Sequence, residues 1–462
     1  MSVVVFYPRG FDAEGRYITA TLERFLGVEF RSEASRDSVT RICVDGYAGE
    51  ICMPDIYFRD FHRGSQNKTK AARQAVVCWD ARQLAPNISL IDFEVPVVFG
   101  HAIPVTRLEG QRLDLPIDIL GSIFFVLSRY EELVISERDH HDRFPATASL
   151  AYQQHFLDRP IVDEYVEILW AAMKQVWPGL ERKQRQGTVC VSCDVDQPFD
   201  RVGTSPLRLA RSIGGDLGKR RDASLALRRC ANFVAHRRGD FRFDPYYTFE
   251  WYMDMCERAG RRATFFFIAD HSGGAIDGTY DINEPRVVNL IRMISERGHE
   301  IGMHGSYNTY RDPAQIATER QRLLEACAAA GVNAPIEGNR QHYLRWDAAE
   351  TPEHLDAAGF SYDTTGSFAD APGFRYGTSR TFPMWGWRTN EPLNLEQRPL
   401  VLMECSVIAD QYLGLGYSDE AISTMLKLKE RAMRYGGDFT MLWHNSHLLT
   451  GKDREFFQQL IR

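Results

Sequence analysis

The sequence predicts an α/β fold built on a mainly parallel sheet in its C-terminal part. From about residue 245 onward, short β-branched or aromatic runs alternate with longer segments of helical periodicity. Because parallel neighbours need a long connection, usually a helix, this alternation indicates a parallel sheet, either open or closed into a barrel. Helices are expected at 248–258, 284–297 and 313–330, and strands at 188–193, 263–268 and 299–303, with later strands near Ile336, Tyr362, 400–403 and 439–443.

The N-terminal part predicts a smaller α/β domain. Short apolar runs at 3–6 and 97–99 are typical of strands, and residues 115–132 indicate a mostly buried helix that Glu131 and Glu132 would end. Residues 162–176 place apolar side chains on one helical face. A polar stretch at 181–187 would join the two parts, so we expect domains at 1–183 and 187–462.

Composition excludes some classes of protein. A hydrophobic content of 44% with 25% charged residues is ordinary for a folded globular protein. A net charge of -7 argues against a dedicated nucleic-acid-binding protein. No stretch approaches the roughly 20 apolar residues of a membrane span. The first ten residues lack the pattern of an export signal, so we expect a cytoplasmic protein.

The nine cysteines do not suggest a disulfide framework, because their number is odd and they are scattered. Cys190 and Cys193 have the spacing of a redox or zinc motif, but no second such pair accompanies them. On a strand, residues three apart point to opposite faces. We therefore expect buried strand cysteines.

A basic stretch at about 201–242 interrupts the C-terminal domain, with arginine doublets at 220–221, 228–229 and 237–238. Such a run is usually a solvated surface, here on a partly helical insertion. The alternative is a flap that attracts an anionic substrate or a membrane surface.

Two clusters at the ends of predicted strands carry metal-binding residue types. Asp194 and Asp196 would lie on one face of an extended chain and could divide the work of metal ligand and general base. His304 and Asn308 are four residues apart, so one helical turn would bring them to the same side. Histidine is the commonest side-chain ligand of neutral metal sites, whereas asparagine is a poor ligand for zinc.

Two further clusters carry residues suited to catalysis. Arg340, close to His342 and Tyr343, is able to hold a carboxylate in place. His444 ends an apolar strand, which is a suitable place for a general acid. Both lie where α/β folds usually place their sites.

In order, these motifs resemble the NodB-type polysaccharide deacetylases, carbohydrate esterase family four. The closest matches are Ala263–Ile268 and Arg297–His304, and the resemblance covers about residue 187 to the C-terminus. It implies a distorted (β/α)7, TIM-like barrel and a divalent metal ion, most often zinc, with nickel or cobalt as alternatives. It also implies hydrolysis of an N-acetyl group on a carbohydrate.

The resemblance further implies a role for each matching residue. Asp194 would be the general base, Asp196 and His304 metal ligands, and His444 the acid that protonates the leaving amine. Arg340 would tether the base, and the backbone amide of Tyr343 would help bind the oxyanion.

Three positions depart from the family pattern. Val195 separates the two aspartates, which leaves their roles interchangeable. Asn308 stands where a second histidine ligand is usual, so an amide oxygen, a water molecule or His342 would complete the site, or the site is degenerate. His342 replaces the usual proline before Tyr343.

The N-terminal part also resembles an uncharacterised domain that precedes a divergent deacetylase subgroup. Ser128–Glu132 and Arg143–Ala146 carry this resemblance. It assigns no biochemical role to the domain.

The leading hypothesis is a metal-dependent carbohydrate N-deacetylase that acts on an N-acetylated sugar, for which a nucleotide- or lipid-linked sugar is one candidate form. One alternative is a non-catalytic carbohydrate-binding or assembly protein on a degenerate deacetylase fold. The other is an amidohydrolase acting on a non-sugar amide. The sequence leaves the oligomeric state open.

Overall fold

The computed structural model describes residues 2–62, 68–101, 106–108, 111–200, 205–236 and 240–462, and the chain forms two compact units. The first comprises Met1–Thr188, Leu344–Val401 and Lys427–Phe439, and the second Val189–Tyr343, Leu402–Leu426 and Thr440–Arg462. The first unit thus includes two late segments that a division into consecutive stretches does not anticipate. The predicted domains 1–183 and 187–462 stay a prediction.

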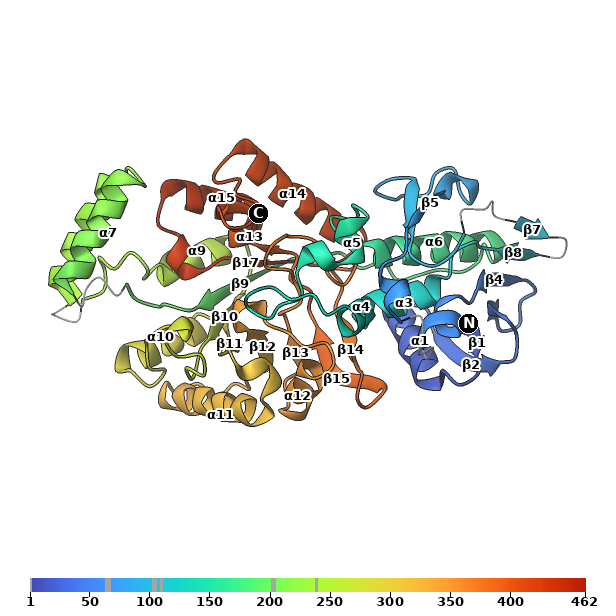
Figure 1. The fold of residues 1–462 in the computed structure, drawn as a ribbon, viewed down its shortest axis with the longest axis horizontal. Coiled ribbons are helices and arrows are strands. Elements are labelled where there is room, and N and C mark those ends of the chain that lie inside the picture. Colours follow the sequence, from blue (N-terminus) through green and yellow to red (C-terminus); the bar gives the residue numbers. More distant parts are fainter. Residues whose placement is uncertain (1, 63–67, 102–105, 109–110, 201–204, 237–239) are drawn as a thin grey trace. The chain divides into compact units, whose positions relative to one another are not determined.

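A mixed six-stranded sheet, ordered β2-β1-β3-β4-β8-β7, forms the frame of the first unit (Figure 1). Its strands are β1 (Val3–Pro8), β2 (Phe30–Ser35), β3 (Val39–Val44), β4 (Glu50–Pro54), β7 (Thr106–Leu108) and β8 (Arg112–Asp114). Helix α1 (Asp12–Leu26) connects the parallel pair β1 and β2. β5 (Val77–Asp80) and β6 (Glu94–Val97) form a separate antiparallel pair, so the run predicted at 97–99 is strand only at Val97.

The single helix predicted at 115–132 is wrong, because the chain forms two helices there, α3 (Ile119–Leu127) and α4 (Tyr130–Val134). Asp118 caps α3 by accepting a hydrogen bond from the Gly121 amide at 2.8 Å. Arg129 separates the helices with a left-handed backbone, φ 54°. Glu131 and Glu132 therefore lie in the first turn of α4 rather than at the end of a helix. Helix α6 (Ile161–Val176) confirms the second prediction.

Burial of charge explains the break between α3 and α4. Arg129 is buried and bonds Glu131 at 2.6 Å and Glu132 at 2.7 Å. Glu132 also pairs with Arg375 at 2.7 Å. Burial alone would raise the pKa of Glu132, but the two guanidinium groups outweigh it and lower that pKa from 4.5 to about 2.

Glu132→Gln is expected to destabilise the chain by about 3–5 kcal/mol at pH 7, because it leaves buried arginine charge uncompensated. The folded-state pKa of Glu132 is depressed, so its contribution is present above the unfolded-state value of 4.5 and is lost as the pH falls toward 2. Denaturant unfolding of the wild type and of Glu132→Gln at pH 7 and pH 3 measures this difference in the free energy of unfolding. Glu391→Gln, which breaks the exposed ion pair with Arg16, should cost less than about 1 kcal/mol. Equal losses in the two variants would contradict the account.

A curled nine-stranded sheet follows the order β14-β15-β13-β12-β11-β10-β9-β17-β16 (Figure 1). The strands are β9 (Val189–Val195), β10 (Ala263–Phe267), β11 (Glu300–Gly305), β12 (Gly338–Gln341), β13 (Tyr362–Asp363), β14 (Phe382–Gly386), β15 (Glu391–Gln397), β16 (Leu402–Met403) and β17 (Phe439–Leu442). β9 to β12 are successively parallel, as are β16 and β17, which confirms the mainly parallel sheet. The sheet has nine strands where seven were implied, and it includes an unpredicted antiparallel pair, β14 and β15.

Helices of the second unit include α9 (Phe249–Arg258), α10 (Pro285–Glu296), α11 (Pro313–Ala329) and α15 (Gly451–Ile461). Helices α9, α10 and α11 confirm the predictions at 248–258, 284–297 and 313–330, whereas α15 was not predicted. Asp312 caps α11 by accepting hydrogen bonds from the amides of Ala314 and Gln315, with Pro313 at the first position of the helix. Apolar side chains of α9 and β10, such as Tyr252 and Phe265, pack with ring centroids 5.4 Å apart in the core beside the sheet.

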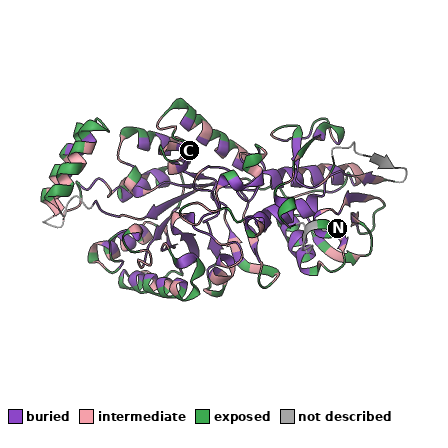
Figure 2. Cartoon of the chain, viewed as in Figure 1, coloured by how far each residue is buried: buried purple, intermediate pink, exposed green. Residues whose placement is uncertain are grey.

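The basic stretch forms two helices, α7 (Pro206–Gly218) and α8 (Ala223–Ala235), which confirms that it is partly helical. Most of α7 is exposed or half-buried (Figure 2). Arg229 departs from a solvated surface, because it is buried and pairs with Asp216 at 2.7 Å and with Asp200. The doublet at 237–238 lies outside the described residues.

Cys190 and Cys193 lie on β9 as thiols that are not joined in a disulfide, the first half-buried and the second buried. The predicted strand is confirmed. Within the described part of the chain, no helix has the length and apolar character needed to span a membrane.

Candidate metal and catalytic site

All four predicted clusters lie in the second unit, at the carboxyl ends of neighbouring strands. Asp194 is near the end of β9, and Asp196 follows that strand. His304 lies in β11 and Arg340 in β12. His444 follows β17, which neighbours β9 in the sheet. Because these strand ends meet at one edge, residues more than 200 positions apart in the sequence come together.

Asp194 is held by Arg340. The Arg340 Nη1 atom lies 3.0 Å from Asp194 Oδ1 and 2.8 Å from Ser192 Oγ. Arg340 is fully buried, and its guanidinium lies 4.8 Å from the centre of the Phe266 ring. A guanidinium fixed in this way holds the neighbouring carboxylate in one orientation.

Three imidazole rings face Asp196. His304 Nε2 lies 3.3 Å and His342 Nε2 3.8 Å from Asp196 Oδ1. His444 Nε2 lies 3.6 Å from Asp196 Oδ2. His304 Nε2 is also 3.5 Å from Asp194 Oδ2, so the two predicted aspartates share one neighbour.

Each of these rings is oriented through its other nitrogen. The Nδ1 atoms bond the Arg340 carbonyl oxygen at 2.8 Å for His304, Asp277 Oδ1 at 2.7 Å for His342, and Glu404 Oε1 at 2.5 Å for His444. A neutral imidazole that donates from Nδ1 carries its lone pair on Nε2. Lone pairs and carboxylate oxygens thus face one another around Asp196, an arrangement that needs protons or a cation between them.

The donor set fits a divalent metal ion. Asp196, His304 and His342 each offer one ligand atom, and these atoms lie within 4.8 Å of one another. Asp196 Oδ1 is buried and has no hydrogen-bond partner among the described residues, because the facing nitrogens lack hydrogen-bond geometry. Two imidazole nitrogens and one carboxylate oxygen are a typical zinc donor set that leaves a position open for water or substrate.

The pKa values show how strongly this site attracts positive charge. Burial alone would raise the pKa of Asp196, but His342, His304 and His444 hold that pKa well below its usual range. Burial opposes protonation of His342, yet Asp196 and Asp277 raise its pKa to about 9. Glu404 and Asp196 likewise raise the pKa of His444 well above its usual value, against the effect of burial.

Asn308 makes a different set of contacts from those expected. Its Nδ2 atom donates to the Ser272 carbonyl oxygen at 2.8 Å, and its backbone amide donates to Ser272 Oγ at 2.9 Å. Asn308 precedes a short 3-10 turn, Thr309–Arg311, so the α-helical turn expected after His304 does not form. His342 presents a ligand atom close to Asp196 and His304. The ligand role of Asn308 stays a prediction.

The backbone at Tyr343 is strained. Tyr343 has φ 61° and Leu344 φ 55°, two consecutive left-handed residues that are not glycine. Such a conformation persists only where the surroundings fix it, and it often marks a functional turn. The Tyr343 ring packs against His342 at 4.7 Å and Tyr307 at 5.5 Å between centroids. Oxyanion binding by the Tyr343 amide stays a prediction.

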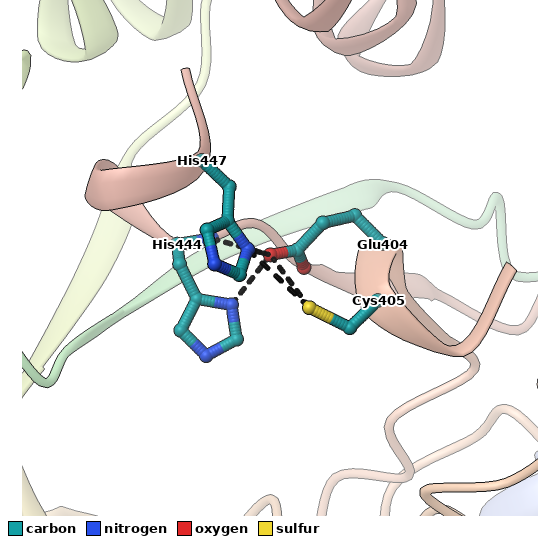
Figure 3. A group of neighbouring side chains, drawn as sticks. All are labelled: Glu404, Cys405, His444 and His447. Atoms are coloured by element: carbon teal, nitrogen blue, oxygen red, sulfur yellow. Dashed lines mark hydrogen bonds and ion pairs between the residues drawn. The ribbon is translucent and has the colours of Figure 1, made fainter. Parts of the chain in front are cut away.

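Four residues of this region were missed in the sequence. Asp277 is fully buried and bonds His342, and Glu404 bonds both His444 and His447 (Figure 3). Cys405 and His447 complete the second group. The only sequence signal was the three-residue spacing of His444 and His447, which on a short helical turn brings both side chains to one side.

The chain is similar to one family model and to several solved structures. Residues 3–178 match a family model described as a family of unknown function, DUF7033. No curated protein matches this chain. Solved structures similar to it include polysaccharide deacetylases, a family 4 carbohydrate esterase and an allantoinase.

Three of these structures illustrate the level of similarity. A proposed polysaccharide deacetylase from Mycobacterium smegmatis is 18% identical, with a TM-score of 0.39 over 60% of this chain and 84% of that one. The PuuE allantoinase is 16% identical, with a TM-score of 0.35 over 62% and 85%. A family 4 carbohydrate esterase from Streptomyces lividans, solved in complex with acetate, is 12% identical, with a TM-score of 0.26 over 60% and 90%.

Proposed function

We propose that this protein is a metal-dependent hydrolase that removes the acetyl group from an N-acetylated carbohydrate. The observation that carries the proposal is the placement of Asp194, fixed by Arg340, beside the ligand-type group of Asp196, His304 and His342. The order of the sequence motifs supports the carbohydrate substrate. A nucleotide- or lipid-linked sugar is the form we favour.

A divalent ion bound by Asp196, His304 and His342 would polarise the amide carbonyl and lower the pKa of a water molecule. We assign the ligand role to Asp196 because three imidazoles face its carboxylate. We assign the base role to Asp194, whose Oδ1 atom is bonded to Arg340 while Oδ2 faces His304. Arg340 keeps this carboxylate oriented to accept a proton from the attacking water.

His444 is placed to act as the general acid. Its Nδ1 atom is bonded to Glu404, which stabilises the imidazolium form, and its Nε2 atom points toward Asp196. A protonated Nε2 is able to deliver a proton to the departing nitrogen, which cannot leave as an amide anion. Against the effect of burial, Glu404 and Asp196 raise the pKa of His444, which favours this protonated form.

The non-catalytic alternative rested on Asn308 in place of a histidine. His342 supplies a third ligand-type side chain and weakens that ground. An amidohydrolase acting on a non-sugar amide uses the same residues, so only the choice of substrate separates it from the leading proposal.

The experiment measures bound metal and acetate release with the full-length protein. It is loaded with one equivalent of zinc, nickel or cobalt and offered N-acetylated monosaccharides, oligosaccharides, nucleotide-linked sugars and simple acetamides. We expect bound metal and acetate release from at least one N-acetylated sugar. Protein that binds no metal and releases no acetate from any substrate would overturn the proposal, and hydrolysis of non-sugar amides alone would favour the amidohydrolase.

A further inference from the structure

We propose that Glu404, Cys405, His444 and His447 form a second, inhibitory metal site for a thiophilic divalent cation such as zinc. The ion-binding part of this inference stands on the four side chains alone. The inhibitory part deepens the proposed function, on which it rests, because His444 belongs to both sites.

Two chain segments build this group (Figure 3). Glu404 and Cys405 begin α13 (Glu404–Ile408), directly after β16. His444 and His447 follow β17. β16 and β17 are parallel neighbours, with Met403 paired to Leu442, so both segments leave the sheet at the same edge.

The ligand atoms lie close to tetrahedral spacing. Cys405 Sγ is 3.3 Å from His447 Nδ1 and 3.7 Å from Glu404 Oε1. Glu404 Oε1 is 2.8 Å from His447 Nδ1 and 2.5 Å from His444 Nδ1. In a tetrahedral zinc site, bond lengths of about 2.0–2.3 Å separate the ligand atoms by roughly 3.3–3.7 Å. The sulfur is already at that spacing, and the imidazoles need to move outward by less than about 1 Å.

The chemistry of the group selects the ion. A thiolate with two imidazoles and one carboxylate favours zinc and similar thiophilic ions over magnesium or calcium. Glu404 is 2% exposed, and its Oε2 atom has no hydrogen-bond partner among the described residues, so a cation would satisfy a buried charge. The His447 side chain is 45% exposed, which leaves the ion a route from solvent.

Occupancy of this second site would disable His444 as an acid. As a general acid, the His444 imidazolium holds one proton on Nδ1, toward Glu404, and gives up the other from Nε2. With a cation on Nδ1, the ring is neutral, and loss of the Nε2 proton would leave an imidazolate. That ring is a far weaker acid than an imidazolium. The second ion therefore slows protonation of the leaving group.

The first test is the metal stoichiometry of the full-length protein titrated with Co²⁺. We expect two ions per wild-type chain and one in Cys405→Ser and in His447→Ala. Thiolate-to-cobalt charge-transfer absorption should appear in the wild type and in Asp196→Asn, and disappear in Cys405→Ser. Cys43→Ser, which removes a half-buried thiol of the first unit, is the matched control and should keep the signal. Wild-type protein without the thiolate band would overturn the site, whereas a single ion per wild-type chain that gives this band would count against the first site instead.

The second test is acetate release with one and with several equivalents of Zn²⁺. The wild type should lose at least tenfold in activity as the second site fills. Cys405→Ser and His447→Ala should change less than twofold relative to their own activity with one equivalent. Equal inhibition of all three proteins would overturn the inhibitory role. If no protein released acetate, the proposed function would fail while the cobalt spectra still decided the second site.

Discussion

His342→Ala is expected to abolish tight binding of the first metal ion, whereas Asn308→Ala is expected to leave it almost unchanged. His342 faces Asp196 with Nε2 and is anchored by Asp277 at 2.7 Å, but the side chain of Asn308 donates to Ser272. Loss of an outer hydrogen-bond partner typically costs 10–100-fold in affinity, so loss of a ligand should exceed about 100-fold. A change of less than about twofold fits a surface amide.

Calorimetric zinc titration in a Cys405→Ser background isolates the first site. Asp277→Asn serves as an intermediate case, because it weakens the anchor of His342 without removing the ligand, and a loss of about 10–100-fold is expected. Tight binding by His342→Ala combined with loss of binding by Asn308→Ala would show that the ligand assignment is wrong.

Asp194→Asn is expected to lower kcat by about 10²–10⁴-fold while the protein still binds one equivalent of metal in the same background. The amide keeps an oxygen for Arg340 to bond but loses the basicity needed to accept a proton. The measurement pairs acetate release with metal content. Asp240→Asn, which replaces an aspartate paired with an exposed Arg242, is the matched control and should keep wild-type activity.

If Asp194→Asn lost the bound metal and Asp196→Asn kept it, Asp194 would be the metal ligand and Asp196 the base. The structure argues against that exchange. Three imidazoles face Asp196, whereas Oδ1 of Asp194 is hydrogen-bonded to Arg340.

The parallel part of the sheet could be predicted because its signals are local. Apolar runs such as Ala263–Phe267 and helical periodicity such as Pro313–Ala329 depend only on neighbours in the chain. Strands β14 and β15 were not predicted, because Pro383 interrupts β14 and polar residues occupy much of β15. The break at Arg129 was not predicted, because it depends on a buried group in which Glu132 pairs with both Arg129 and the distant Arg375.

The sequence could predict most residues of the candidate site, but not which of them contact one another. Asp194, Asp196, His304 and His444 lie near the ends of apolar strands, and strand ends converge in a parallel sheet. Arg340 lies in the short polar strand β12. The third ligand was not decided, because the choice between Asn308 and His342 depends on the left-handed turn at Tyr343 and on the contact with Ser272. Glu404 and Cys405 join His447 only through the pairing of β16 with β17, which no local pattern reveals.

A crystal structure of the Cys405→Ser protein with one equivalent of zinc, measured at the zinc absorption edge, tests the central claim most directly. The account predicts one anomalous peak within about 2.0–2.2 Å of ligand atoms from Asp196, His304 and His342, with Asp194 still bonded to Arg340. A peak bound by Asn308 in place of His342, or no peak beside Asp196, would contradict it.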